Sequence, residues 1–135
     1  MIQFEVAVRV VAPPGRRDYG YLSVVSQWFS RPELVLRMPP GVFRPPPKVA
    51  SALVSLRMPG ARETIDVGDE KTFLDFVKEC FAQKRKNLRN NLRARLGSRA
   101  GEVLREAGLS LDARAEELSA SQFAELFRLI VRSEK

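Results

Sequence analysis

Two stretches of the sequence carry side chains that could do chemistry. In the first, Phe43 and Lys48 flank a run of prolines. The second spans residues 84 to 99 and contains cations with no Asp or Glu among them: Lys84, Arg85, Lys86, Arg89, Arg93, Arg95 and Arg99. A fixed aromatic ring can hold a planar group, and clustered cations can bind a polyanion. The chemistry suggested is recognition of an anionic partner.

Prolines surround Phe43 at positions 39, 40, 45, 46 and 47. Each proline fixes its own φ near −65° and keeps the residue before it extended, so this loop should be stiff and non-helical. The apolar runs on either side, Glu33–Met38 and Lys48–Met58, read as strands, and their short connection favours antiparallel pairing. On these grounds alone the simplest interpretation tucks Phe43 into the core, and the alternative has the loop present the ring outward.

The cationic stretch belongs to a predicted helix that starts after Asp69 and ends at Gly97, with a leucine stripe along one side. Arg85, Arg89 and Arg93 are spaced one turn apart, so they can face phosphate while the leucines pack. Nucleic-acid binding is the favoured interpretation and a solvated basic face is the alternative. Lys84 and Arg95 fall nearer the apolar side, where their stems can pack.

The charge of the chain supports this interpretation. It holds 23 Lys and Arg against 16 Asp and Glu, so its net charge of +7 resides entirely in residues 84–99. A charge excess confined to one segment indicates a polyanionic partner rather than general solubility.

For several polar and aromatic side chains, the sequence allows either a nucleic-acid-binding role or a structural one. Lys48 can contact a nucleic-acid backbone or discourage aggregation as an edge-strand lysine. The asparagines of the cationic helix can bind sugar or phosphate, or can cap or kink the helix locally: Asn87, Asn90 and Asn91. Tyr21 and Trp28 could stack on bases, but they lie on the apolar stripe of a predicted helix, Tyr19 to Ser30, and are expected in the core instead.

The remaining elements follow from periodicity and caps. Residues 2 to 12 alternate like a strand, although the resemblance described below implies a helix there, which we adopt. Pro59 to Gly68 reads as a polar connector. A short helix is predicted around Ala100–Ala107. Ser119 and Gln122 form a predicted capping box for a last helix with an apolar stripe.

The composition excludes several kinds of site. The chain has no histidine, so neither a zinc site nor a histidine-based triad is expected. Its single cysteine, Cys80, lies in an apolar helical context and reads as a core residue in a reducing, cytoplasmic setting. No apolar run approaches the length of about 20 residues that a membrane span needs. No paired carboxylates form a recognisable catalytic motif.

Three ordered motifs resemble the KsgA/Erm-type rRNA adenine dimethyltransferases over nearly the whole chain. The motifs are Tyr19-Gly20-Tyr21-Leu22-Ser23-Val24, then Phe43-Arg44-Pro45-Pro46-Pro47-Lys48-Val49-Ala50-Ser51-Ala52-Leu53-Val54, then Phe81-Ala82-Gln83-Lys84-Arg85-Lys86-Asn87-Leu88-Arg89-Asn90-Asn91-Leu92. In that family the aromatic at the position of Phe43 packs against the adenine to be methylated. The resemblance therefore favours the outward ring over the buried one.

The sequence lacks two motifs that this family carries. The family's Gly-rich S-adenosylmethionine loop and its Asn-(Leu/Ile)-Pro-Tyr motif do not occur in this sequence. Met1 corresponds to an internal position of the family. The implied chain is the C-terminal portion of a methyltransferase, which should not bind S-adenosylmethionine and should be inactive alone. The implied full-length protein is an S-adenosylmethionine-dependent rRNA (adenine-N6,N6)-dimethyltransferase that serves ribosome biogenesis.

The resemblance implies an α/β fold in which a remnant of a Rossmann-like methyltransferase domain, helices plus an antiparallel strand pair, precedes a small all-helical domain. Residues 1–58 would be the last part of the methyltransferase domain, 59–68 a linker and 69–135 the helical rRNA-binding domain. We expect a metal-free monomer that binds rRNA or a ribosomal subunit, and the motif forms favour the small-subunit type. The alternative is a stand-alone, non-catalytic RNA- or ribosome-binding module.

Overall fold

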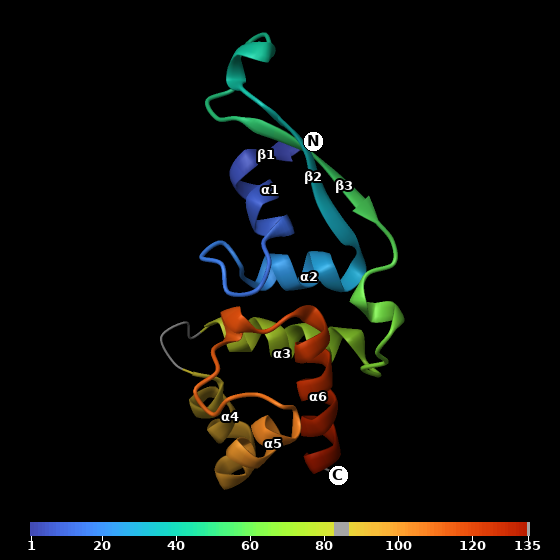
Figure 1. Cartoon of the computed structure of the whole chain (residues 1–135), viewed down its shortest axis with the longest axis vertical. Helices are drawn as coiled ribbons and strands as arrows, with labels where there is room; N and C mark the ends of the chain where they lie inside the picture. The colour runs from blue at the N-terminus through green and yellow to red at the C-terminus, as the bar shows by residue number, and fades with distance from the viewer. Residues whose placement is uncertain (83–86, 135) are drawn as a thin grey trace.

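Strands β2 (Arg31–Met38) and β3 (Ser51–Arg57) form an antiparallel pair at one end of the molecule, as predicted. The structure, a computed structural model, describes residues 1–82 and 87–134 (Figure 1). The register joins Arg31 to Arg57 and shifts between Leu34 and Leu36. A short strand, β1 (Ile2–Gln3), pairs antiparallel with the other edge of β3, which gives the order β1-β3-β2.

Helix α1 (Phe4–Val11) packs beside the sheet, and helix α2 (Tyr21–Phe29) lies between the sheet and the helices that follow it in the chain (Figure 1). The predicted helix over residues 2–12 is confirmed from Phe4 onward, whereas Ile2 and Gln3 are in the strand β1. Helix α2 holds the end of α1 through side chains. The Ser23 hydroxyl donates to the carbonyl of Arg9, and the Gln27 amide donates to the carbonyl of Ala12 at 2.8 Å.

Residues beyond the sheet form helices α3 (Glu70–Ala82), α4 (Leu88–Leu96), α5 (Ala100–Glu106) and α6 (Ala120–Glu134). The predicted starts of α3, after Asp69, and of α6, after Ser119, are confirmed. The Asp69 carboxylate accepts from the Lys71 N–H at 3.0 Å and from the Thr72 hydroxyl at 2.8 Å, and these bonds lower its pKa. Ser119 and Gln122 make both bonds of a capping box, at 2.9 and 3.2 Å.

The prediction of one helix from Asp69 to Leu96 is wrong. Helix α3 ends at Ala82, and Asn87 is extended, with φ −74° and ψ 166°. The Asn87 Oδ1 accepts the N–H of Asn90 at 3.0 Å, so this residue caps a new helix, α4. The leucine stripe misled the prediction because Leu88, Leu92 and Leu96 are all buried, but in a helix separate from the one that buries Phe81.

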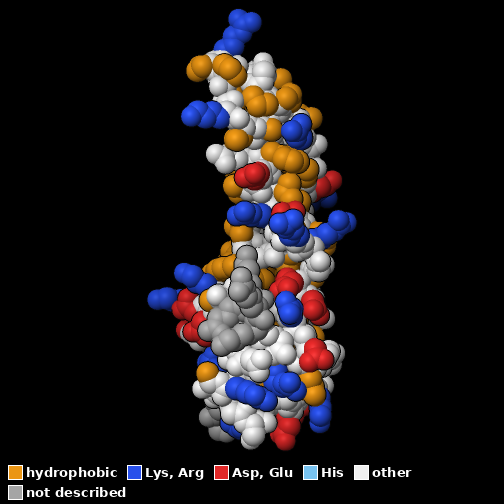
Figure 2. Space-filling view, turned by 90° about the vertical axis from the view of Figure 1, so that its left-hand side faces the viewer, with side chains coloured by type: hydrophobic (Ala, Val, Ile, Leu, Met, Phe, Trp, Pro, Cys, Tyr) orange, Lys and Arg blue, Asp and Glu red, His pale blue; other side chains and the backbone are white. Residues whose placement is uncertain are grey.

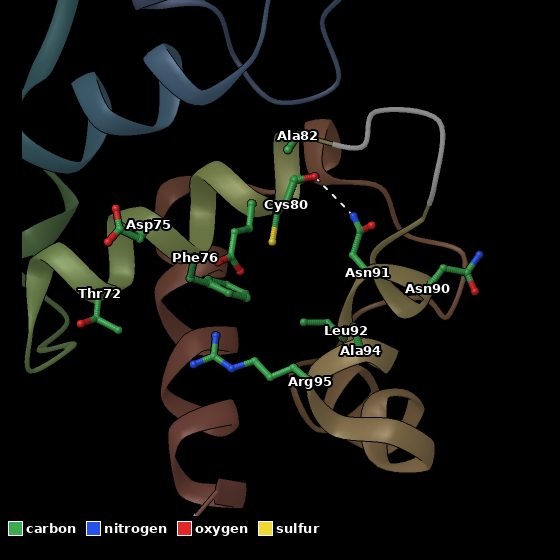
Figure 3. A pocket seen from close by; sticks show the side chains of 11 residues that line it. Thr72, Asp75, Phe76, Cys80, Ala82, Asn90, Asn91, Leu92, Ala94 and Arg95 are labelled. Atoms are coloured by element: carbon green, nitrogen blue, oxygen red, sulfur yellow. Dashed lines mark hydrogen bonds between the residues drawn. The ribbon is translucent and has the colours of Figure 1, made fainter.

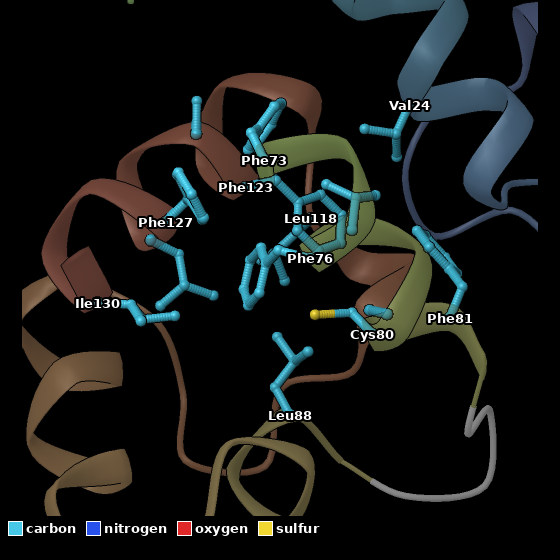
Figure 4. Close-up of a cluster of buried hydrophobic side chains, with 14 of the residues drawn as sticks. Val24, Phe73, Phe76, Cys80, Phe81, Leu88, Leu118, Phe123, Phe127 and Ile130 are labelled. Carbon is cyan, nitrogen blue, oxygen red and sulfur yellow. The ribbon is translucent and has the colours of Figure 1, made fainter. Parts of the chain in front are cut away.

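The core lies in the helical half and extends into α2. Trp28 and Phe73 are buried with ring centroids 4.7 Å apart, and Phe73 lies 5.5 Å from Phe127 of α6. Figure 4 shows this cluster, with Val24 of α2 facing the aromatic side chains. Tyr19 is also buried and its hydroxyl donates to the carbonyl of Leu118. Residues before and after the connector, residues 59–68, therefore share one core, although the sequence predicts a linker there.

Gly60→Ala is expected to destabilise the fold by about 1–3 kcal/mol or more, because a side chain there would overpack against rigid backbone. A Cβ at position 60 would lie 2.6 Å from the carbonyl oxygens of Gln27 and Ser30. Gly41→Ala is the matched control, since no heavy atom lies within 4 Å of its added Cβ. Urea unfolding midpoints of the two variants test this, and equal midpoints would contradict the close approach.

Candidate nucleic-acid interface

The loop that carries Phe43 forms the tip of the sheet end (Figure 1). A single 3-10 turn, Pro40–Val42, precedes Phe43, whose N–H donates to the carbonyl of Pro40 at 3.2 Å. Phe43 itself is half-buried and does not belong to the buried cluster found among the described residues. The interpretation that places this ring in the core is therefore wrong.

Three cations lie close to Phe43 along the chain. Arg44 and Lys48 are exposed on the same loop. Arg37, near the end of β2, is exposed and places its guanidinium carbon 4.9 Å from the ring centroid of Phe4. Sequence reasoning named Lys48 but missed Arg44, although its position directly after Phe43 was an available signal. The loop thus combines an aromatic ring with side chains that can bind phosphate.

Helix α4 carries the described part of the cationic stretch. Its leucines are buried, and Arg93 and Arg95 are exposed, as is Arg99 just beyond the helix. Arg89 differs from the expected solvent-facing side chain, because it is half-buried and its Nε has no hydrogen-bond partner among the described residues. The stem of Arg89 therefore packs, a role that the sequence had assigned to Arg95. Lys84, Arg85 and Lys86 lie outside the described residues.

Two of the three asparagines have structural roles. Asn87 caps α4, and the Asn91 side chain donates to the carbonyl of Cys80 at 3.4 Å, which ties α4 to the end of α3. Asn90 is exposed. Of the two interpretations that the sequence left open, local capping holds for Asn87.

A cavity of about 760 Å³ lies between α3 and α4 (Figure 3). Asp75 and Glu79 line it from α3, whereas Asn90 and Arg95 line it from α4. Cys80 also lines it, but burial raises the pKa of this thiol to about 12, so the thiol remains protonated at neutral pH. No group of His, Cys, Asp or Glu in the described residues could hold a metal ion. This arrangement supports binding and offers no nucleophile.

The predicted site residues are not brought together. The loop between β2 and β3, which contains Phe43 and Lys48, lies at one end of the long axis, and α4 lies toward the other (Figure 1). Figure 2 shows Lys and Arg side chains at several heights along one face, with acidic side chains between them. Arg9 and Arg17 line a cavity of about 400 Å³ together with Tyr21 and Phe81. Sequence reasoning missed these two arginines because only the tertiary fold brings them together.

The described helices include none with the length and hydropathy that a bilayer crossing requires.

Comparison with known proteins identifies relatives along almost the whole chain. The family model for ribosomal RNA adenine dimethylase matches residues 1–132. A protein of Acidobacterium capsulatum named ribosomal RNA small subunit methyltransferase A is 46% identical over 132 residues, which is 96% of this chain and 46% of that protein. The protein of the same name in Rubrobacter xylanophilus is 46% identical over 130 residues, or 96% of this chain and 48% of that protein. The chain therefore spans about half the length of these relatives.

Solved structures show a similar fold at lower identity. A dimethyladenosine transferase from Plasmodium falciparum matches with a TM-score of 0.76 and 21% identity, over 92% of this chain and 53% of that one. The 23S rRNA methyltransferase ErmE matches with a TM-score of 0.63 and 24% identity, over 96% of this chain and 52% of that one. The combination of helices with a small antiparallel sheet is thus similar to that of methyltransferase structures.

Proposed function

Because this chain belongs to the ribosomal RNA adenine dimethylase family, we propose that it supplies the rRNA and target-adenine contacts of an S-adenosylmethionine-dependent rRNA adenine dimethyltransferase. The observation that supports this most is the position of Phe43, on a proline-stiffened loop outside the buried cluster and beside Arg44 and Lys48. An aromatic face and neighbouring cations are the two features that binding of an unstacked base on a phosphate backbone needs.

Each feature has a role in methylation of an exocyclic amine. The adenine must leave its stack, and Phe43 provides a face that replaces part of the lost stacking. Arg44 and Lys48 bind the phosphates next to that nucleotide. S-adenosylmethionine supplies the methyl group and is bound by the half of the enzyme that lies outside the matched region of the relatives. We propose the small-subunit rRNA as the target, in line with the names of the relatives.

The separation between the loop and α4 determines how the RNA is held. Since the loop that contains Phe43 lies at one end of the molecule and α4 lies toward the other (Figure 1), one nucleotide cannot contact both. The proposed contacts of Arg93, Arg95 and Arg99 are therefore with a second rRNA segment, where they position the subunit without reading sequence. Arg85, Lys84 and Lys86 are proposed to extend this contact, as their charges in the sequence suggest.

Arg93→Ala is expected to lower the salt dependence of RNA binding while the fold stays intact. Each phosphate contact that is lost reduces the slope of log K against log salt by about 0.7–0.9. The triple variant that also carries Arg85→Ala and Arg89→Ala should reduce the slope by the equivalent of up to about three phosphate contacts. Arg89 should contribute least to this reduction because its stem is half-buried.

The matched control is Arg128→Ala, which removes an exposed arginine from α6. Fluorescence anisotropy with a small-subunit rRNA fragment, measured at several salt concentrations, provides the slopes. If Arg93→Ala and Arg128→Ala leave the same slope as the unmodified chain, the RNA surface does not lie on α4.

A further inference from the structure

A cavity of about 660 Å³ lies where the connector, residues 59–68, leads into α3. Residues 62–70 form most of its lining, and Trp28 lines it from α2. In Figure 1 the connector runs from the end of β3 to the start of α3, on the side of the molecule away from α4. These residues take no part in the proposed rRNA contacts, so the cavity is a separate place for a ligand.

Carboxylates predominate among the side chains that line this cavity. There are four of them against one cation, and the residues are Glu63, Asp66, Asp69 and Glu70, with Arg62 as the cation. Four negative charges and one positive charge give the lining a formal charge of −3, although the whole chain carries +7. A lining of this sign repels a polyanion such as RNA and favours a cationic ligand.

Helix α3 keeps the acidic cavity apart from the cationic residues of α4. It has 13 residues, which span about 20 Å at about 1.5 Å per residue. The cavity lies at its first turn, and α4 follows its last turn (Figure 1). That distance exceeds the screening length of about 8 Å at physiological salt. The two regions can therefore bind oppositely charged partners at the same time.

One guanidinium of the chain already lies at the edge of the cavity. The Nη2 of Arg62 is 2.9 Å from the carboxylate of Glu70, and its Cζ is 5.1 Å from the ring centroid of Phe29. Carboxylates and aromatic faces are the groups that commonly hold a guanidinium. This pair neutralises its own charges, so the negative charge of the lining resides on the other three carboxylates.

Asp66 and Asp69 form no ion pair in the described part of the chain, where the printed pairs join other residues. The Oδ1 of Asp66 accepts the N–H of Gly68 at 2.8 Å, and Asp69 caps α3. Both side chains are exposed. Turn and cap bonds explain why carboxylates stand at these positions, and they do not prevent either carboxylate from pairing with an added cation.

Trp28 adds an observation that turns and caps do not explain. The residue is 1% exposed, and its indole Nε1 has no hydrogen-bond partner among the described residues. Buried indole N–H groups usually donate to an acceptor. Because Trp28 lines the cavity, a ligand that occupies the cavity can supply the missing acceptor.

The ligand must therefore offer a cation to the carboxylates and an acceptor to the indole N–H. A metal ion offers no acceptor, and no three His, Cys, Asp or Glu side chains of the described residues are placed to hold one. A protonated polyamine has only donors. A polypeptide rich in Lys or Arg has both groups, since its side chains are cationic and its main-chain carbonyls accept. Its aliphatic stems can pack on Ile65 and Val67, which also line the cavity.

We propose that this cavity binds a basic segment of another protein, with Lys or Arg side chains paired to Asp66 and Asp69 and a main-chain carbonyl bonded to the N–H of Trp28. This site goes beyond the proposed rRNA contacts and does not depend on them. Since Nε1 is buried, the carbonyl reaches it when the connector shifts. No α-helix resists such a shift, because residues 59–68, all of them described, form a single 3-10 turn, Ala61–Glu63.

The test follows the indole N–H of Trp28 by NMR, which gives one resonance because Trp28 is the only tryptophan of the chain. The probe is the peptide Gly-Arg-Gly-Lys-Gly-Arg-Gly, titrated into the whole chain. We expect saturable binding and a downfield shift of the indole proton as it bonds to a carbonyl. The same peptide with Glu in place of its Arg and Lys residues should leave the resonance unchanged.

Asp66→Asn combined with Asp69→Asn should lower the affinity for the basic peptide at least tenfold. Asparagine also forms such turns and caps, so the circular dichroism of the chain should not change. The matched control combines Asp112→Asn with Glu125→Gln, which removes two exposed charges elsewhere on the molecule. Equal losses of affinity in the two double variants would overturn the proposal, because the peptide would then respond to net charge alone.

The indole resonance supplies the remaining decisive outcomes. Binding of the basic peptide without a shift of that resonance would place its site outside the cavity and overturn the proposal, as would an absence of saturable binding. A shift caused by spermine, a polyamine, would overturn it too, because no carbonyl would then be needed. If the basic peptide shifts the resonance and spermine does not, the cavity recognises a polypeptide.

Discussion

Phe73→Ala is expected to lower the free energy of unfolding by about 3–5 kcal/mol, the cost of removing a fully buried phenylalanine. Phe73 is 0% exposed and joins three helices. Its ring, on α3, lies 4.7 Å from the centroid of Trp28 on α2 and 5.5 Å from that of Phe127 on α6. Truncation would remove both ring contacts and leave a cavity between elements that cannot collapse independently.

Urea unfolding followed by tryptophan fluorescence measures this loss directly, because Trp28 is the only tryptophan in the chain and touches the deleted ring. Leu22→Ala is the control, since Leu22 lies on the same helix as Trp28 but is 42% exposed. Its loss should stay within about 0.5 kcal/mol, as for other surface changes. A similarly small loss for Phe73→Ala would show that the two halves do not share one core.

Local sequence patterns predicted the elements whose stability is local. The strand pair follows from two apolar runs separated by prolines, and the last helix follows from the reciprocal bonds of Ser119 and Gln122. The break at Asn87 was missed for a physical reason. Its leucine stripe continues through the break, so hydrophobic periodicity cannot distinguish one long helix from two that bury the same kind of face. The extended backbone of Asn87 and its capping bond to Asn90 separate them.

Contacts between distant residues could not be predicted from the sequence. The hydroxyl of Tyr19 donates to the carbonyl of Leu118, 99 positions away, and no periodic pattern encodes that pairing. The same applies to the half-buried position of Arg89, which depends on how α4 packs on its neighbours. In the candidate site, the motif around Phe43 predicted a stiff loop, but its distance from α4 depends on the intervening helices (Figure 1).

The role proposed for Phe43 leads to the second large effect, which has to be measured in a longer chain that joins this sequence to a cofactor-binding half. Stacking of a base on an aromatic side chain is worth about 1–3 kcal/mol. Phe43→Ala should therefore reduce the rate of methyl transfer to rRNA by roughly tenfold or more. Phe43→Tyr and Phe43→Trp should be milder because each keeps a π-face.

Stability separates this role from a structural one. Phe43 is half-buried and outside the buried cluster, so its truncation should cost well under the about 3–5 kcal/mol of a core phenylalanine. Val42→Ala is the matched control, since Val42 is the preceding residue of the loop and is 61% exposed but has no aromatic face. It should leave both melting temperature and methyl transfer nearly unchanged.

Measuring melting temperature and methyl transfer on the same variants decides between the two roles. A base-stacking ring predicts loss of transfer at an unchanged melting temperature, with activity in the order Phe, then Tyr or Trp, then Ala. A packing ring predicts the reverse, with a lower melting temperature, unchanged transfer per folded molecule, and Trp tolerated worst because it overfills its site. If Phe43→Ala follows the second pattern, Phe43 only shapes the loop, and the adenine must be held by the cofactor half.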